Sequence, residues 1–441
     1  MENPLLGYTV ASHLRMKHRR RATLSSTDSQ VSPAGAPPAR QANLKFILVS
    51  VFIDMLGVGL LVPALPLLVG EFVATKELQA QWYGILASVF GLLQFLCMPL
   101  LGVLSDKVGR RPVMLYSMAG MCLNFLTTAL ATSLPLLFVG RVLGGMSAAS
   151  MSVASAYASD ISTPENRAKS FGMIGAAFGF GFICGPALGG LLGHFGMRVP
   201  FYLAAVLSAC NFLYGYFVVP ESLPQDRRSP FSWARANPFG SILALVKRRD
   251  VRGLIVAYSF STFAQILMQT TWVLYTHFRF GWGTMENGWA LTCVGIGSAI
   301  VQALLLGRLI KSLGEVRLAL LGIGSSAVTF VLYGLATEGW MMYALIVCNM
   351  LAFAAGPAMQ AIISKATDPR AQGSLMGSLQ SISSLSLVIG PYFGASVLAR
   401  VGSLPHGDWH AGATFYISAA LQGCAAVVAW LYFRSHTSLS Q

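Results

Sequence analysis

The feature that most constrains the fold is a series of long apolar runs. A helix needs about 20 mostly apolar residues to cross a hydrocarbon core of about 30 Å. Runs of this kind lie at residues 46–70, 82–104, 112–132, 134–158, 168–192, 200–219, 252–276, 287–310, 316–336, 340–363, 374–398 and 412–433. Barrel strands are shorter, about 9–11 residues, and alternate in polarity. We therefore expect an all-α membrane protein with twelve transmembrane helices.

Composition excludes several classes of protein. Apolar residues make up 55% of the chain and charged residues only 10%, against about 25% charged in a soluble domain. This excludes a soluble enzyme, a disordered protein and a nucleic-acid-binding domain, although the net charge of +14 alone would suggest the last. We expect a lipid bilayer as the environment and no nucleic acid partner. Because no Walker loop, catalytic triad or metal-ligand cluster occurs, we expect no enzyme activity, no cofactor and no metal.

The distribution of lysine and arginine predicts the orientation. If the N-terminus is cytoplasmic, the cytoplasmic segments hold 25 of these residues and the outward loops hold 4. Cytoplasmic loops carry such an excess, so both termini are predicted to be cytoplasmic. We expect the plasma membrane rather than an organelle membrane.

The chain divides into two halves with polar flanks. Residues 1–43 are predicted to be a basic, disordered cytoplasmic tail, with an organelle transit peptide as the alternative. Residues 44–220 form a first six-helix half, 221–251 a cytoplasmic linker, 252–434 a second six-helix half and 435–441 a short tail. The segment 239–246 is a candidate for a short helix on the inner surface.

An internal repeat supports this division. A shift of 205 residues places Gly102 and Gly109 on Gly307 and Gly314. The same shift aligns Pro164 with Pro369, Gly172 with Gly377, Gly185 and Pro186 with Gly390 and Pro391, and Gly189 with Gly394. Two parallel six-helix repeats around a central cavity resemble the arrangement of the major facilitator superfamily.

The loop after the second run resembles the signature loop of that superfamily, G-x-L-x-D-x-x-G-R-R/K. Its defining residues are Gly102, Asp106, Gly109, Arg110 and Arg111. Asp106 is expected to accept hydrogen bonds at the N-terminus of the helix at 374–398. Arg110 and Arg111 are expected to bridge to acids such as Asp160, so that the loop acts as a latch between the halves. The alternative is a basic loop that only sets orientation.

The fifth run resembles a motif associated with antiporters, G-x-x-x-G-P-x-x-G-G. It contains Gly181, Gly185, Pro186, Gly189 and Gly190. Gly181, Gly185 and Gly189, with Gly193, recur every four residues and form a flat face. We expect this face to pack against the helix at 287–310 of the other half. A packing role and a role in coupling direction both remain open.

One acid and one base lie deep in the runs. They are Asp54 in the first run and Arg141 in the fourth. Charged groups in hydrocarbon are costly, so they mark function by default. We expect the two side chains to pair, with Asp54 carrying a proton and Arg141 tuning the pKa of Asp54. A purely structural ion pair is the alternative.

Amide and aromatic side chains are expected to give the cavity its chemistry. The candidates for substrate binding are Gln94, Asn124, Gln265, Gln269, Trp272 and Phe353. Helix packing or interfacial anchoring is the alternative for each. Such a lining does not offset the desolvation cost of a cargo with several charges. We therefore expect a cargo with rings and at most one charge.

Further residues resemble the bacterial tetracycline/proton antiporters over about residues 44–400. They include Ile53–Leu60 with Pro63 and Pro66, Tyr83–Leu86, Gln94 and Phe95 with Pro99, Pro220–Ser222, Asn237 and Pro238, and Gly339–Met341. The resemblance implies exchange of a metal–tetracycline chelate for a proton. Asp54 matches the first-span acid of the family. Asn124 stands where the family has an acid, Ser325 and Ser326 lie near another such position, and Trp82 replaces a histidine, so we do not expect tetracycline itself as cargo.

These observations lead to one functional hypothesis and two alternatives. The hypothesis is a monomeric proton-coupled antiporter that exports a small amphipathic or aromatic organic compound by alternating access. Its partners are protons and that small molecule. One alternative is a symporter or facilitator of a metabolite in the same fold. The other is a membrane scaffold or sensor that transports nothing.

Overall fold

The computed structural model describes residues 42–163, 166–240, 252–366, 372–405 and 408–435. The predicted basic tail, except its last two residues, lies outside this range. So do Pro164, Pro369 and most of the candidate surface helix at 239–246.

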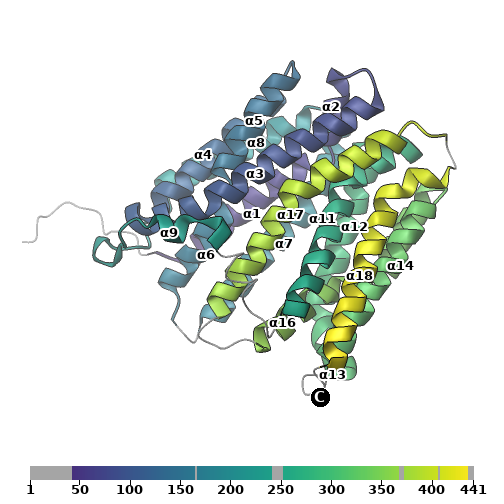
Figure 1. Cartoon of the computed structure of the whole chain (residues 1–441). Coiled ribbons are helices and arrows are strands. Elements are labelled where there is room, and N and C mark those ends of the chain that lie inside the picture. Colours follow the sequence, from purple (N-terminus) through teal and green to yellow (C-terminus); the bar gives the residue numbers. More distant parts are fainter. Residues whose placement is uncertain (1–41, 164–165, 241–251, 367–371, 406–407, 436–441) are drawn as a thin grey trace, which may run out of the picture. The chain divides into compact units, whose positions relative to one another are not determined.

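The described chain is built from helices (Figure 1). The first half contains α1 (Leu44–Leu61), α2 (Leu65–Val69), α3 (Lys76–Val108), α4 (Arg110–Ala129), α5 (Leu134–Ser147), α6 (Ser150–Ile161), α7 (Arg167–Phe195) and α8 (Val199–Phe217). The second half contains α11 (Arg252–Phe280), α12 (Thr284–Ile300), α13 (Leu306–Leu313), α14 (Glu315–Leu335), α15 (Gly339–Cys348), α16 (Ala355–Lys365), α17 (Gln372–Val401) and α18 (Ala413–Ser435). A short helix α9 (Trp233–Ala236) lies between the halves in sequence.

The structure confirms an all-α membrane fold. Within the described residues, nine helical segments are long and apolar enough to cross a membrane, and α15 with α16 forms a tenth, bent by 49°. The remaining two predicted spans are α4 and α11, of 20 and 29 residues. These two helices are less apolar than the others because they contain more polar and charged side chains, including Asn124, Gln265 and Gln269.

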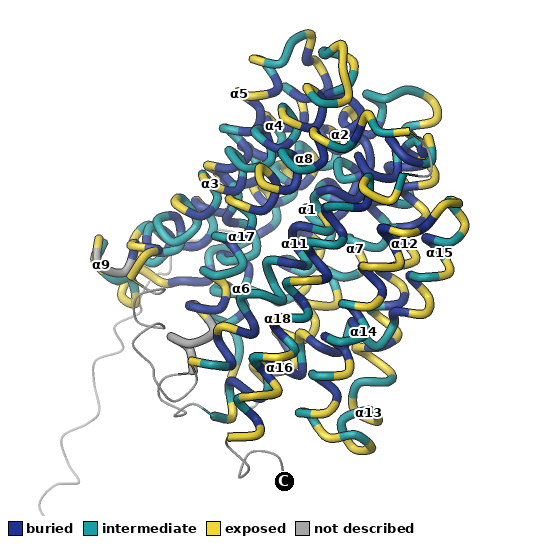
Figure 2. Tube along the Cα trace, turned by 45° about the vertical axis from the view of Figure 1, so that its right-hand side comes forward, coloured by how far each residue is buried: buried dark blue, intermediate teal, exposed yellow. Residues whose placement is uncertain are grey.

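Large apolar side chains cover the outer surfaces of the helices. Figure 2 shows exposed residues along helices such as α12 and α15. The most exposed apolar side chains on the long helices include Phe180, Phe195, Val206, Phe217, Leu304, Val328, Trp340 and Val347. Apolar surface of this extent is unfavourable in water but suits lipid, where helices also satisfy their own backbone hydrogen bonds.

The two halves share local geometry at equivalent positions. Gly109 and Gly314, which are 205 residues apart, both have positive φ, at 110° and 77°, and both join two helices through a tight turn. Pro186 and Pro391 both lie inside long helices. The fourth predicted span breaks between α5 and α6 near Ala148, and the tenth breaks between Asn349 and Ala354. The repeat in sequence is therefore also a repeat in structure.

Most of the glycine face of α7 packs against α1, and its last part packs against α12 of the other half. A Cβ added at Gly185 would lie 2.6 Å from the Cα of Gly59, and one added at Gly181 would lie 2.7 Å from the carbonyl oxygen of Phe52. The predicted partner, the helix at 287–310, therefore meets only part of this motif. Gly181, Gly185 and Gly189 face α1, whereas Gly193 faces Thr284 of α12, and a Cβ at Gly190 would lie 3.0 Å from the Cα of Gly288. The reason is that α7 lies between α1 and α12.

The contacts between the halves lie toward one end of the long helices. We call the end with residues 105–111, 220–229 and 311–315 the basic end, and the other the opposite end. A Cβ at Gly84 of α3 would lie 3.0 Å from the carbonyl oxygen of Pro391 of α17, and one at Gly288 of α12 would lie 2.6 Å from that of Pro186. These contacts lie nearer the opposite end, whereas the first turns of α7, near the basic end, are largely exposed.

The packing of α1 on α7 can be tested with two substitutions on one helix. Gly185→Ala places a methyl group against backbone atoms of α1, so we expect a loss of about 1–3 kcal/mol. Gly175→Ala is the matched control because nothing lies within 4 Å of a Cβ there. Thermal unfolding of the detergent-solubilised protein should show a lower midpoint for the first variant alone. Equal midpoints would contradict close packing at Gly185.

Candidate functional site

A cavity of about 500 Å³ lies between the two halves. This volume is in the range of sites for drug-sized ligands. Its polar and aromatic lining comes mostly from the first half, and Thr270, Gln380, Leu387 and Pro391 contribute from the second. The first-half residues include Asp54, Tyr83, Phe90, Gln94, Asn124, Phe125, Arg141, Ser150, Phe178 and Phe182.

Asp54 lies on α1 at the wall of this cavity. Its side chain is buried, and Oδ1 accepts a hydrogen bond of 2.9 Å from Nδ2 of Asn211 on α8. The same Nδ2 also donates to the carbonyl oxygen of Ser50, at 3.1 Å. Asn211 therefore holds the carboxyl group of Asp54 against α8. Sequence reasoning missed Asn211, although an amide inside an apolar run was the available signal.

Arg141 lies on α5 and has neutral partners. Its Nη2 donates to Oδ1 of Asn124 at 2.6 Å and to Oγ1 of Thr128 at 3.1 Å, both on α4. The guanidinium carbon lies 5.7 Å from the centre of the Phe90 ring. No ion pair joins Arg141 to Asp54 among the described residues, so the predicted pair is wrong. Each charged group is held by a polar side chain of the helix packed beside its own.

The predicted substrate residues fall into two separate cavities. Gln94 and Asn124 line the central cavity, whereas Gln265, Gln269, Trp272 and Phe353 line a cavity of about 80 Å³ within the second half. Trp272 is buried and makes edge contacts with Tyr333 and Phe415, with ring centres 5.2 and 6.2 Å away. The structure thus does not bring all six residues to one site.

Aromatic residues that sequence reasoning missed supply the walls of the central cavity. Phe178 and Phe182 of α7 stack at 6.3 Å with an angle of 8° between the rings. Their spacing of four residues places both on one face of the helix. Tyr83, Phe90 and Phe125 extend the aromatic lining from α3 and α4. Among the described residues, no group of His, Cys, Asp and Glu side chains could hold a metal ion.

The signature loop forms a charged cluster at the basic end. Arg110 contacts Asp106 at 2.5 Å and Asp160 of α6 at 2.9 Å. The backbone N–H groups of Arg110 and Arg111 donate to the carboxylate of Glu221, at 2.8 and 3.2 Å, so this acid caps the N-terminus of α4.

Among the described residues, the printed contacts of this cluster tie the first half to the segment that follows α8. The predicted contact between Arg110 and Asp160 is present, but both residues belong to the first half. The backbone carbonyl oxygen of Asp106 also accepts a hydrogen bond from the backbone N–H of Ser229, at 3.0 Å. The role of Asp106 at the start of α17 stays a prediction, since residues 367–371 and the side chains of 372–376 are outside the described part.

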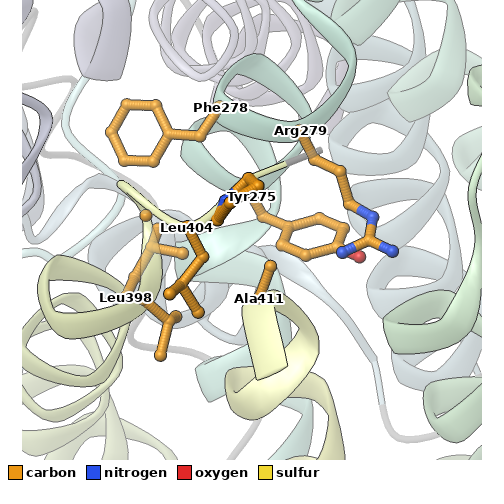
Figure 3. Close-up of a pocket in the computed structure, with 9 residues that line it drawn as sticks. Tyr275, Phe278, Arg279, Leu398, Leu404 and Ala411 are labelled. Atoms are coloured by element: carbon orange, nitrogen blue, oxygen red, sulfur yellow. The ribbon is translucent and has the colours of Figure 1, made fainter. Parts of the chain in front are cut away.

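A small pocket at the opposite end has a structural role. Figure 3 shows Tyr275, Phe278, Arg279, Leu398, Leu404 and Ala411 around a space of about 20 Å³. That space holds about one water molecule. Arg279 donates to the carbonyl oxygens of Ala336 and Asp408, at 2.8 and 2.9 Å, and so joins α11 to two loops.

A helical membrane protein with a ligand-sized cavity between two repeated halves has the architecture of a transporter. The sequence matches the Major Facilitator Superfamily over residues 47–288 and 274–440, and the chain belongs to this superfamily. It is 36% identical to the class C tetracycline resistance protein of Escherichia coli over 378 residues, which cover 84% of this chain and 93% of that protein.

Solved structures show the same fold. The human organic anion transporter MFSD10 (TETRAN) is 25% identical and superposes with a TM-score of 0.65, covering 89% of this chain and all of that one. The nucleoside transporter NupG is 15% identical, with a TM-score of 0.72 and coverage of 89% and 99%. The protein is a multi-pass membrane protein, and its tetracycline resistance relatives support a drug efflux transporter.

Removal of the negative charge of Asp160 tests the cluster at the basic end. Asp160→Asn should cost about 1–3 kcal/mol, since the buried guanidinium of Arg110 loses a charged acceptor. Asp226→Asn, at an exposed residue of the linker, is the control. We expect a lower thermal unfolding midpoint for Asp160→Asn only. An unchanged midpoint would show that Asp106 and Ser105 are sufficient acceptors for Arg110.

Proposed function

We propose that this protein is a proton-coupled antiporter that exports a small amphipathic or aromatic organic compound by alternating access. The observation that carries the proposal is one cavity of about 500 Å³ that combines a buried acid with aromatic walls. An aromatic wall binds rings by contact area, and a buried acid can bind and release a proton.

The relatives support the class of cargo. The relatives include tetracycline resistance proteins and the organic anion transporter MFSD10. The central cavity has room for a drug-sized organic molecule. The uncharged amides Gln94 and Asn124 would orient the cargo, because amides offer both donors and acceptors.

The packing of the halves supports a single cavity that opens to one side at a time. Close contacts between α3 and α17 and between α7 and α12 lie nearer the opposite end. The exposed first turns of α7 lie nearer the basic end. With the basic end cytoplasmic, as the loop charges predict, this conformation faces inward. Rocking of the halves would close the basic end and open the other.

Asp54 is our candidate for the proton-carrying group. It is the acid of the described cavity lining, and it is held by a neutral amide and not by a cation. Both the protonated and the ionised carboxyl group can hydrogen-bond to Asn211, because an amide both donates and accepts. The site can therefore change its charge without losing this contact.

A proton symporter is the second candidate, and the position of Arg141 favours it. Arg141 has no carboxylate partner among the described residues. A protonated Asp54 together with an anion at Arg141 would leave the cavity without net charge. Cargo and proton would then move in the same direction.

The proton site is tested by Asp54→Asn in proteoliposomes with an imposed pH gradient. The probes are a panel of aromatic amphipathic compounds, tetracycline included. We expect the wild-type protein to accumulate at least one probe and the variant to lose gradient-driven accumulation, because an amide does not titrate. Asp226→Asn is the control that removes an acid elsewhere.

The outcome of this experiment separates the alternatives. An antiporter accumulates the probe in the vesicles when the interior is acidic. A symporter accumulates it when the exterior is acidic. Full gradient-driven accumulation by Asp54→Asn would exclude Asp54 as the carrier. If no probe moves with any gradient, the scaffold or sensor alternative gains support.

A further inference from the structure

We propose that Arg141 binds the single anionic group, a carboxylate, of an aromatic cargo in the central cavity. This inference deepens the proposed function, on which it rests, by assigning the charge of the cargo and the residue that recognises it. It replaces the expectation that Arg141 is neutralised by Asp54.

The buried guanidinium of Arg141 has incomplete hydrogen bonding. Arg141 is only 4% exposed. Arginine offers five N–H donors, but within the described residues only Nη2 donates, to Asn124 and Thr128. Nε is buried and has no hydrogen-bond partner among the described residues. A buried cation with neutral partners is less stable than one that is paired with an anion.

The described lining of the cavity supplies no anion that pairs with Arg141. In the described lining of the central cavity, Asp54 and Arg141 are the charged side chains. The carboxyl group of Asp54 accepts a hydrogen bond from Asn211 of α8, at 2.9 Å, and makes no ion pair with Arg141 among the described residues. Free N–H groups on a guanidinium match the two oxygens of a carboxylate, which they bind as a fork.

Aromatic rings lie beside the guanidinium of Arg141. The Phe90 ring lies 5.7 Å from the guanidinium carbon and lines the same cavity. Phe125 and the stacked pair Phe178 and Phe182 also line it. Rings attached to a carboxylate at Arg141 would lie against these faces. A second negative charge would meet the acid Asp54, so the cavity favours a monoanion.

The experiment measures binding to the purified full-length protein in detergent at neutral pH, with no gradient. The probes are 2-naphthoate and 2-naphthamide, which have the same rings and differ in charge. We expect wild-type protein to bind the acid at least about tenfold more tightly than the amide. Arg141→Gln should remove this preference, and Arg141→Lys should keep part of it.

A second variant tests the proposal without removing Arg141. Asn124→Asp places a carboxylate where the amide oxygen is now 2.6 Å from Nη2, so the guanidinium is paired internally. This variant should stay folded, as monitored by thermal unfolding, and lose the preference for naphthoate at least about tenfold. Gln225→Glu, an equal change of charge in the exposed linker, should keep it.

The result that overturns the proposal is clear. It fails if wild-type protein does not prefer naphthoate over naphthamide, or if Asn124→Asp retains the preference. Because this assay uses no gradient, a preference for the acid without any pH-driven transport would refute proton coupling and leave the anion site. Transport with equal binding of both probes would refute the anion site and leave proton coupling.

Discussion

Contact between backbone surfaces of α1 and α7 is the interaction on which the rest of the site depends. Gly59 and Gly185 face each other with no side chain between them, and α7 reaches α12 through Gly190. In hydrocarbon, helices gain little from burying apolar groups, so association depends on close van der Waals packing of small residues. This packing places Asp54, on α1, at the wall of the cavity between the halves.

The two charged groups of the cavity each bond to neutral side chains of a neighbouring helix and not to each other. Asp54 is held by Asn211 of α8, and Arg141 by Asn124 and Thr128 of α4. Neutral amides stabilise a charge without cancelling it. The cavity therefore keeps one group that can gain a proton and one that can attract an anion. In a direct ion pair, the two charges would neutralise each other.

Each broken helix lines a cavity, and the charged cluster lies at the basic end. Ala148, Ser150 and Met151, at the break between α5 and α6, line the central cavity, and Asn349 and Phe353, at the equivalent break, line the smaller one. Irregular backbone inside a membrane protein is tolerated where it lines a cavity. At the basic end, Arg110, Asp160 and Glu221 bind the start of the linker to the first half.

The sequence by itself determined the membrane class, the helical spans, the repeat and the superfamily. These follow from run length, hydropathy and glycine and proline spacing, which are local properties of the chain. The sequence also identified Asp54, Arg141, Gln94 and Asn124, because polar groups in apolar runs are visible without a structure. Only the tertiary structure decided which of these groups meet, since contacts depend on how each helix is rotated and which helix lies beside it. It separated Asp54 from Arg141, moved Trp272 to a second cavity and turned the glycine face of α7 toward α1.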